Sequence, residues 1–214
     1  VGTSGSNRTI MQVCMTDNDV VVVDRNCHKS IEQGLMLTGA KPVYMVPSRN
    51  RYGIIGPIYP QEMQPETLQK KINESPLTKD KAGQKPSYCV VTNCTYDGVC
   101  YNAKEAQDLL EKTSDRLHFD EAWYGYARFN PIYADHYAMR GEPGDHNGPT
   151  VFATHSTHKL LNALSQASYI HVREGRGAIN FSRFNQAYMM HATTSPLYAI
   201  CASNDVAVSM MDGN

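Results

Sequence analysis

Short apolar runs alternate with longer segments in which apolar residues recur at helical spacing. The apolar runs predict strands, at 20–24, 42–46, 88–92, 117–120, 151–154 and 168–172. The helical pattern predicts helices, at 30–37, 65–73, 102–114, 181–192 and 197–211. Alternation of this kind predicts an α/β fold with a mostly parallel sheet and helices on both faces, which is a three-layer αβα architecture with right-handed crossovers.

Several boundaries carry recognisable start and stop signals. Ser30 is expected to be the N-cap of the helix at 30–37, and Gly39 is expected to end that helix. Pro65 falls in a first helical turn, and Asn102 is a typical N-cap. The segments 47–64, 75–85 and 123–148 have no clean period, so we expect loops there, the last as an ordered loop over the sheet.

The segment from Thr154 to Gln166 places Lys159 directly after His158 and close to Ser156, just past a predicted strand. An unpaired lysine can form a Schiff base with an aldehyde, and hydroxyl and imidazole groups can bind a phosphate. Pyridoxal phosphate carries both groups, so the pattern predicts a site for it. Alone, the same motif would equally suit a loop with a solvated lysine.

Two further segments end strands with polar residues. Asp120 ends an apolar strand, where a carboxylate could pair with a protonated pyridine nitrogen or cap the following turn. His28 follows four valines and an aspartate, where its ring could stack on a flat cofactor or be a polar loop residue. Ligands of α/β sheets bind beyond the carboxyl ends of the strands, so we expect His28, Asp120 and Lys159 at one edge.

The first residues, from Gly2 to Asn7, combine glycines with hydroxyl side chains. Such a loop can bind phosphate at a helix N-terminus, although a disordered terminal segment would have a similar composition.

Composition limits the possible partners. Lys and Arg number 20 against 21 Asp and Glu, a net charge of −1, which provides no basic surface for nucleic acid or an anionic membrane. The apolar runs are too short to span a bilayer. Six cysteines without a Cys-x-x-Cys pair predict reduced, mainly buried thiols, no metal site and a cytoplasmic protein, with Cys27 as a candidate reactive thiol.

Together, these segments resemble the cofactor-binding major domain of the bacterial Orn/Lys/Arg decarboxylases, which have the aspartate-aminotransferase-like fold, fold type I. The resemblance runs along the whole chain and is clearest at 24–30, 119–123, 154–166 and 188–196. Full-length members carry an N-terminal wing domain and a C-terminal small domain. The resemblance therefore implies that residues 1–214 are the major domain of a longer enzyme.

The resemblance also implies a role for each matching residue. Lys159 would form the Schiff base with pyridoxal 5'-phosphate, Asp120 would pair with the ring nitrogen, and His28 would stack on the ring, with Trp123 near it. The residues expected to bind the phosphate are Thr3, Ser4, Ser156 and His158. Thr193 and Thr194 would reach the phosphate of a partner subunit, which implies a homodimer at least and a higher oligomer of dimers.

The activity that the resemblance implies is decarboxylation of a basic amino acid. L-Arginine would give agmatine and carbon dioxide with uptake of one proton, as suits acid resistance; the residues themselves leave lysine and ornithine open. Two other classes also stay open. The chain could be an inactive cofactor-binding or assembly module, or His118 and Asp120 could bind non-haem iron together with His155 or His158.

Overall fold

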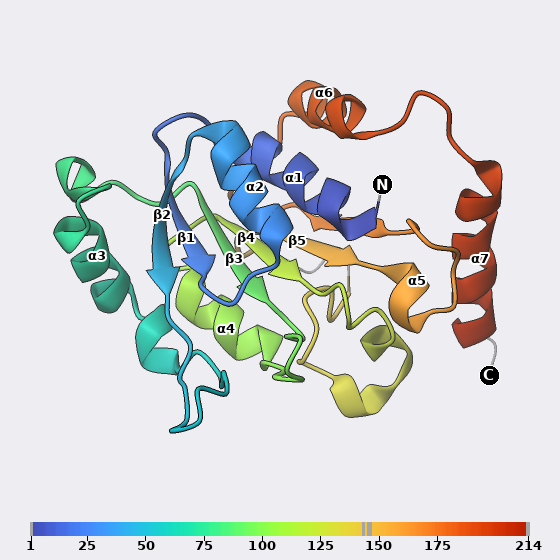
Figure 1. Cartoon of the computed structure of the whole chain (residues 1–214), viewed down its shortest axis with the longest axis horizontal. Helices are drawn as coiled ribbons and strands as arrows, with labels where there is room; N and C mark the ends of the chain where they lie inside the picture. Colours follow the sequence, from blue (N-terminus) through green and yellow to red (C-terminus); the bar gives the residue numbers. More distant parts are fainter. Residues whose placement is uncertain (1, 143, 145–146, 213–214) are drawn as a thin grey trace.

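The computed structural model describes residues 2–142, 144 and 147–212, and shows a central sheet between two layers of helices (Figure 1). The strands are β1 (Val20–Asp24), β2 (Lys41–Met45), β3 (Tyr88–Thr92), β4 (Arg116–Asp120), β5 (Thr150–His155) and β6 (Tyr169–Arg173). The α-helices are α1 (Gly2–Cys14), α2 (Lys29–Thr38), α3 (Pro65–Glu74), α4 (Ala103–Leu110), α5 (Thr157–Leu160), α6 (Phe181–His191) and α7 (Tyr198–Asp212). Short 3-10 helices span Pro60–Met63, Lys79–Lys81, Ala127–Phe129 and Pro131–Tyr133.

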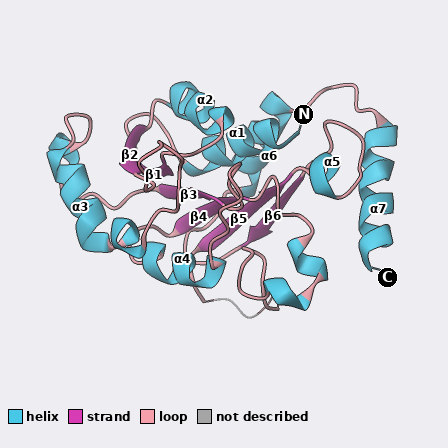
Figure 2. Cartoon of the chain, turned by 60° about the horizontal axis from the view of Figure 1, so that its bottom comes forward, coloured by secondary structure: helices cyan, strands magenta, loops and turns pink. Residues whose placement is uncertain are grey.

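The strand order is β2-β1-β3-β4-β5-β6, with β1 to β5 parallel and β6 antiparallel to β5. Helices α1, α2 and α6 lie on one face, and α3 and α4 on the other (Figure 2). The predicted three-layer, mostly parallel architecture is therefore confirmed. The chain passes from β1 to β2 on one side of β1, and then crosses to β3 on its other side. The sheet therefore has a topological switch point beside β1.

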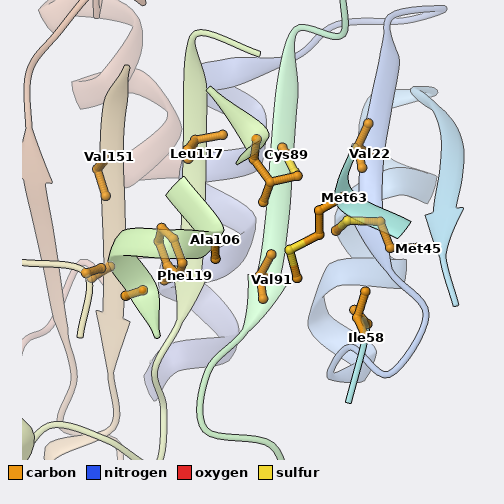
Figure 3. Close-up of a cluster of buried hydrophobic side chains, with 14 of the residues drawn as sticks. Val22, Met45, Ile58, Met63, Cys89, Val91, Ala106, Leu117, Phe119 and Val151 are labelled. Carbon is orange, nitrogen blue, oxygen red and sulfur yellow. The ribbon is translucent and has the colours of Figure 1, made fainter. Parts of the chain in front are cut away.

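The central strands β1, β3, β4 and β5 are buried on both faces, which explains why they are rich in apolar residues. Alternate side chains enter two clusters: Val22, Cys89, Leu117 and Phe119 pack toward α4 (Figure 3), whereas the neighbouring positions pack toward α1 and α2. Because side chains alternate along a strand, His118 and Asp120 of β4 face the opposite side from Leu117 and Phe119, toward α1. The alternation thus turns Asp120 away from the α4 cluster.

Helix α1 was not predicted. The residues expected to form a loop, Gly2 to Asn7, are its first turns, and Ile10, Met11, Val13 and Cys14 are buried on its inner face. Gly, Ser, Thr and Asn have low intrinsic helix propensity. Packing against the sheet and against α2 and α6 compensates for that weakness, as tertiary contacts commonly do.

Other boundaries also differ in detail. His28, and not Ser30, is the N-cap of α2, because its ring accepts the backbone N–H of Ser30. Gly39 ends that helix in the left-handed conformation (φ 72°), and Asn102 caps α4, both as predicted. Helix α4 ends at Leu110, four residues earlier than expected.

Two segments expected to be irregular contain some structure. Lys159 lies on the single helical turn α5 and not in a plain loop. In the 123–148 segment, the rings of Tyr124, Tyr126 and Tyr133 pack edge to face at 5.4–5.7 Å, which orders it as predicted. Residues 143, 145 and 146 lie outside the described residues. Among the helices that the structure describes, none has the length and apolarity that a membrane crossing requires.

The close approach of α1 and α2 depends on Gly34. A Cβ atom at this position would overlap Met11 Sδ, and Met11 is completely buried. Alanine normally stabilises a helix interior by ~1 kcal/mol over glycine, but overpacking costs about 1–3 kcal/mol. We therefore expect Gly34→Ala to lower the free energy of unfolding in urea. Met36→Ala, at an 84% exposed position of the same helix, should change it by less than about 0.5 kcal/mol. A stabilised Gly34→Ala protein would contradict the packing argument.

Candidate active site

A cavity of about 680 Å³ opens at the carboxyl edge of the parallel strands, within the size range of small-molecule sites. It lies between the N-terminus of α1, the segment after β1, the ends of β3 and β4, and α5. Eight of the ten predicted site residues line it: Thr3, Ser4, His28, Asp120, Trp123, Ser156, His158 and Lys159. Segments far apart in sequence, such as those of Thr3 and Ser156 at 153 positions, therefore meet at one edge, as expected.

Lys159 is half-buried at this cavity, with Nζ 4.5 Å from the centroid of the Trp123 ring. Within the described part of the chain, no carboxylate forms an ion pair with it. Burial lowers the pKa of Lys159, and the negative charge of Asp120 opposes that shift. A lowered pKa leaves a larger share of neutral amine than an exposed lysine has, and the neutral amine is the nucleophile.

Asp120 is only 2% exposed, at the end of β4. Its Oδ2 accepts a hydrogen bond from Asn7 Nδ2 at 2.9 Å, and its Oδ1 accepts one from the backbone N–H of Ala122 at 3.2 Å. Burial raises the pKa of Asp120, whereas these bonds and the charges of His28 and Lys159 lower it. The carboxylate thus caps the next turn, as one interpretation expected, and it also lines the cavity. Its pairing with a pyridine nitrogen stays a prediction.

His28 presents its ring to the cavity while fixed at the start of α2. Its Nδ1 lies 3.2 Å from the backbone nitrogen of Ser30 and 2.9 Å from Ser30 Oγ. Burial lowers the pKa of His28; the charge of Asp120 opposes this, and Lys159 and Lys29 reinforce it. A neutral, oriented imidazole is the form that can lie flat on an aromatic ring.

Hydroxyl, imidazole and backbone N–H groups at the start of α1 and of α5 also line the cavity. Thr3 and Ser4 lie in the first turn of α1, where backbone N–H groups have no intrahelical partner and the helix dipole favours anions. Thr3 Oγ1 and Ser156 Oγ are hydrogen-bonded, which joins this turn to the start of α5. His158 Nδ1 donates to the carbonyl of Ala167 at 2.8 Å, so the ring is held in place. This donor set suits a phosphate.

The rim of the cavity is aromatic. Tyr96 packs edge to face on Trp123, with ring centroids 6.3 Å apart, and Trp123 in turn covers Lys159. Two large aromatic rings therefore line the same cavity as the carboxylate, the imidazole and the amine.

The expectations for cysteines need correction. All six are free thiols, but only Cys14 and Cys89 are buried, because position next to apolar residues does not fix exposure. Cys27 lines the cavity and donates to Glu32 at 3.5 Å. Burial, with a contribution from Glu32, raises the pKa of Cys27, which favours the unreactive thiol.

The structure does not bring Thr193 and Thr194 to this cavity. Both are exposed on the connection between α6 and α7, where Thr193 lines a neighbouring hollow that also includes Ser6 and Gln166. Their predicted role toward a partner subunit stays a prediction.

The iron-site alternative has no geometric support. Both ring nitrogens of His118 are engaged, by Tyr88 and Thr154, and His155 Nε2 contacts Glu121 at 3.0 Å. Across residues 2–142, 144 and 147–212, no three His, Cys, Asp or Glu side chains are grouped so that they could bind a metal ion.

Sequence reasoning missed Asn7. This residue is completely buried and bonds directly to Asp120, although 113 positions separate them. The available signal was weak: apolar residues at 10, 11, 13 and 14 have helical spacing, and continuing that helix backward would place Asn7 on its inner face.

Comparison with known proteins agrees with this geometry. The biodegradative arginine decarboxylase of Escherichia coli strain K12 is 99% identical over 214 residues, which are all of this chain and 28% of that protein. The lysine decarboxylase LdcA of Pseudomonas aeruginosa is 49% identical over 213 residues, or 99% of this chain and 28% of that protein. The chain thus spans about 28% of the length of these curated relatives.

Solved structures show the same fold. Lysine decarboxylase A from Pseudomonas aeruginosa superposes with a TM-score of 0.89 at 49% identity, covering 99% of this chain and 28% of that one. Serine palmitoyltransferase of Sphingomonas wittichii superposes with a TM-score of 0.66 at 14% identity, covering 99% and 46%. The second likeness concerns the fold alone, and confirms the predicted fold type I.

The family model for the major domain of the Orn/Lys/Arg decarboxylases matches residues 1–214. Together with the 99% identical relative, this match confirms the family predicted from the motifs. The chain belongs to the Orn/Lys/Arg decarboxylase family, and corresponds to its major domain.

Proposed function

We propose that the protein carrying this chain is a pyridoxal phosphate-dependent decarboxylase that converts L-arginine to agmatine and carbon dioxide. The observation that carries the proposal is the meeting of Lys159, Asp120 and His28 around one cavity of about 680 Å³. The 99% identity to a biodegradative arginine decarboxylase supports the choice of reaction and substrate.

The residues present fit this cofactor. A half-buried amine, a buried carboxylate and a neutral imidazole line one part of the cavity, and the N-terminus of α1 lines another. When bound, pyridoxal phosphate supplies an aldehyde that captures an amine and a ring that accepts electrons from a breaking bond. Its flat ring and its phosphate both find matching groups in this arrangement.

Each side chain then has a defined task. Lys159 binds the aldehyde, and Asp120 keeps the ring nitrogen protonated through a charge-assisted hydrogen bond. His28 packs on the ring face and fixes its tilt. The phosphate is bound by the side chains at the start of α1 and α5, which are Thr3, Ser4, Ser156 and His158. Trp123 covers the amine and limits the access of water.

The reaction changes the proton balance of its surroundings. The bond between the α-carbon and the carboxylate breaks, carbon dioxide leaves, and a proton takes its place on the α-carbon. One proton is consumed per substrate, which fits a role in acid resistance. The action of the protein in the cytoplasm stays a prediction.

Lysine and ornithine are the alternative substrates. Relatives named lysine decarboxylases are 49% and 43% identical to this chain, and relatives named ornithine decarboxylases are 36% and 35% identical. A guanidinium needs planar, paired acceptors, whereas an ammonium is a point charge. Assaying the three amino acids side by side would decide between them.

Assembly is part of the proposal. Thr193 and Thr194 are exposed, so a second copy could reach them. Large apolar side chains are also exposed on the two flanking helices and the connection between them: Phe181, Tyr188, Met189, Met190, Leu197 and Tyr198. We therefore propose a homodimer as the minimum active unit, with further association of dimers. On this proposal, the chain alone is a cofactor-binding and assembly unit of limited activity.

Replacing Lys159 tests the central assignment. We expect Lys159→Ala to lower kcat by at least about a thousandfold, because the covalent attachment point is lost. Borohydride reduction of the cofactor-loaded enzyme followed by peptide mapping should find the adduct on Lys159. Lys29→Ala is the matched control, since Lys29 lines the same cavity. An adduct on another lysine, or normal turnover of Lys159→Ala, would overturn the assignment.

The negative charge of Asp120 should raise the pKa of Lys159, because the carboxylate stabilises the ammonium. Asp120→Asn removes that charge, so the titration of Lys159 should move to lower pH. Reductive ¹³C-methylation of the cofactor-free protein, followed by NMR across pH, would measure the shift. Asp108→Asn, which removes an exposed carboxylate paired with Lys104, should leave Lys159 unchanged. A titration that moves to higher pH would contradict this electrostatic account.

A further inference from the structure

A row of buried polar side chains extends from Asp120 into the sheet, away from the cavity. Tyr88 Oη lies 2.5 Å from His118 Nδ1, and His118 Nε2 lies 3.1 Å from Thr154 Oγ1. Thr154 Oγ1 lies 2.8 Å from Asn7 Oδ1 and 3.5 Å from Asp120 Oδ1. None of these five residues is more than 2% exposed. Leaving a buried polar group unpaired costs about 1–3 kcal/mol, so every bond in the row matters.

The direction of each hydrogen bond follows from the chemistry of the groups. The carbonyl oxygen of Asn7 and the carboxylate of Asp120 only accept, so the single hydrogen of Thr154 is donated to them. Thr154 Oγ1 therefore accepts from His118 Nε2–H. Burial lowers the pKa of His118 to about 3, so the ring is neutral and its Nδ1 accepts. Tyr88, whose pKa burial raises, keeps its proton and donates it to Nδ1.

Asn7 joins this row to the other side of the site. One hydrogen of its Nδ2 goes to Asp120 Oδ2 and the other to Ser30 Oγ, both at 2.9 Å. Because Ser30 Oγ accepts from Asn7, its own hydrogen is free for His28 Nδ1, 2.9 Å away. The same asparagine thus orients the carboxylate and, through Ser30, the imidazole.

We propose that Tyr88, His118, Thr154 and Asn7 are positioning residues, forming an oriented hydrogen-bond chain that holds Asp120 ionised and aimed at the cofactor ring nitrogen. The proposal rests on the proposed function. All donors of the chain point toward Asp120, so the carboxylate stays an acceptor on its inner side. Its remaining capacity is left for a proton carried by the ring nitrogen.

Tyr88 supports this direction from the far end of the chain, outside the cavity lining. If His118 carried its hydrogen on Nδ1, the Tyr88 hydroxyl would have to accept it, and the hydrogen of Tyr88 would lose its acceptor on Nδ1. Thr154 would then turn its hydrogen toward His118 Nε2, and Asn7 and Asp120 would lose it. The acceptors Asn7 and Asp120 at one end of the chain and the Tyr88 hydroxyl at the other therefore favour the same tautomer of His118, with its hydrogen on Nε2.

Neutron diffraction of the whole protein without cofactor tests the chain directly. We expect deuterium on Nε2 of His118, on Oη of Tyr88 pointing at His118, and on Oγ1 of Thr154 pointing at Asn7 or Asp120. In Tyr88→Phe, deuterium should stay on Nε2 of His118, because Asn7 and Asp120 still accept the hydrogen of Thr154. Deuterium on Nδ1 of His118 in the unsubstituted protein, or a Thr154 hydroxyl that points at His118, would overturn the proposal.

Cofactor affinity gives a second readout. Thr154→Val keeps the shape but removes the hydroxyl, and should weaken binding of pyridoxal 5'-phosphate about tenfold, or ~1.4 kcal/mol. Thr154→Ser keeps the hydroxyl and should restore most of the affinity. Tyr101→Phe is the control for loss of a hydrogen-bonded hydroxyl outside the chain, because the Tyr101 hydroxyl accepts from Ile58 N, away from the cavity. It should leave the cofactor affinity unchanged. Unchanged affinity in Thr154→Val, or equal losses in Val and Ser variants of normal stability, would contradict a positioning role.

The two proposals fail separately. If pyridoxal 5'-phosphate does not attach to Lys159, the proposed function fails, whatever the tautomer of His118. If attachment occurs but Thr154→Val binds the cofactor normally, only the positioning chain fails.

Discussion

The site is built around one costly group, a carboxylate buried to 2% exposure at the end of a strand. Removing such a charge from water costs several kcal/mol unless hydrogen bonds replace the lost hydration. Those bonds come from separate parts of the chain: the side chain of Asn7 on α1 and the backbone of Ala122 just past β4. Placing α1 against the sheet is therefore also what makes an ionised Asp120 tolerable.

Parallel pairing explains how distant segments supply the site. Asp120 pairs in register with Thr154 on one side and with Thr92 on the other. The strict alternation of side chains then separates two adjacent acids. Asp120 faces α1 and the cavity, whereas Glu121 accepts from Asn93 and from the backbone of Ala138, and binds His155. Asp120 thus serves the site, whereas Glu121 anchors the segments that contain Asn93 and Ala138.

Much of this arrangement was predictable from the sequence, because buried strands and capped helices leave strong local signals. Apolar runs located all six strands within one or two residues, and the position of Lys159, Asp120 and His28 at strand ends predicted their convergence. Features decided by tertiary contacts were not predictable. Helix α1 forms from weak helix formers because the sheet supports it, and the antiparallel direction of β6 leaves no mark on a short apolar run.

The features of the site that the sequence did not reveal depend on contacts between distant segments. Asn7 is a polar residue whose partners lie 23, 113 and 147 positions away, so no local pattern reveals its role. His28 was assigned to the cofactor, but that its ring also caps α2 depends on its side-chain rotamer, which sequence does not specify. Thr193 and Thr194 are exposed in the single chain, so their predicted role concerns a surface that one copy cannot complete.

The contact between Lys159 and Trp123 has an optical consequence. Trp123 is the single tryptophan of this chain, and its ring centroid lies 4.5 Å from the amine. A chromophore attached to that amine would lie close to the indole. If it absorbs at the wavelengths at which the indole emits, it would quench that emission by energy transfer. The intrinsic fluorescence of this region is thus a built-in gauge of occupancy, sensitive to the reactive position without any added label.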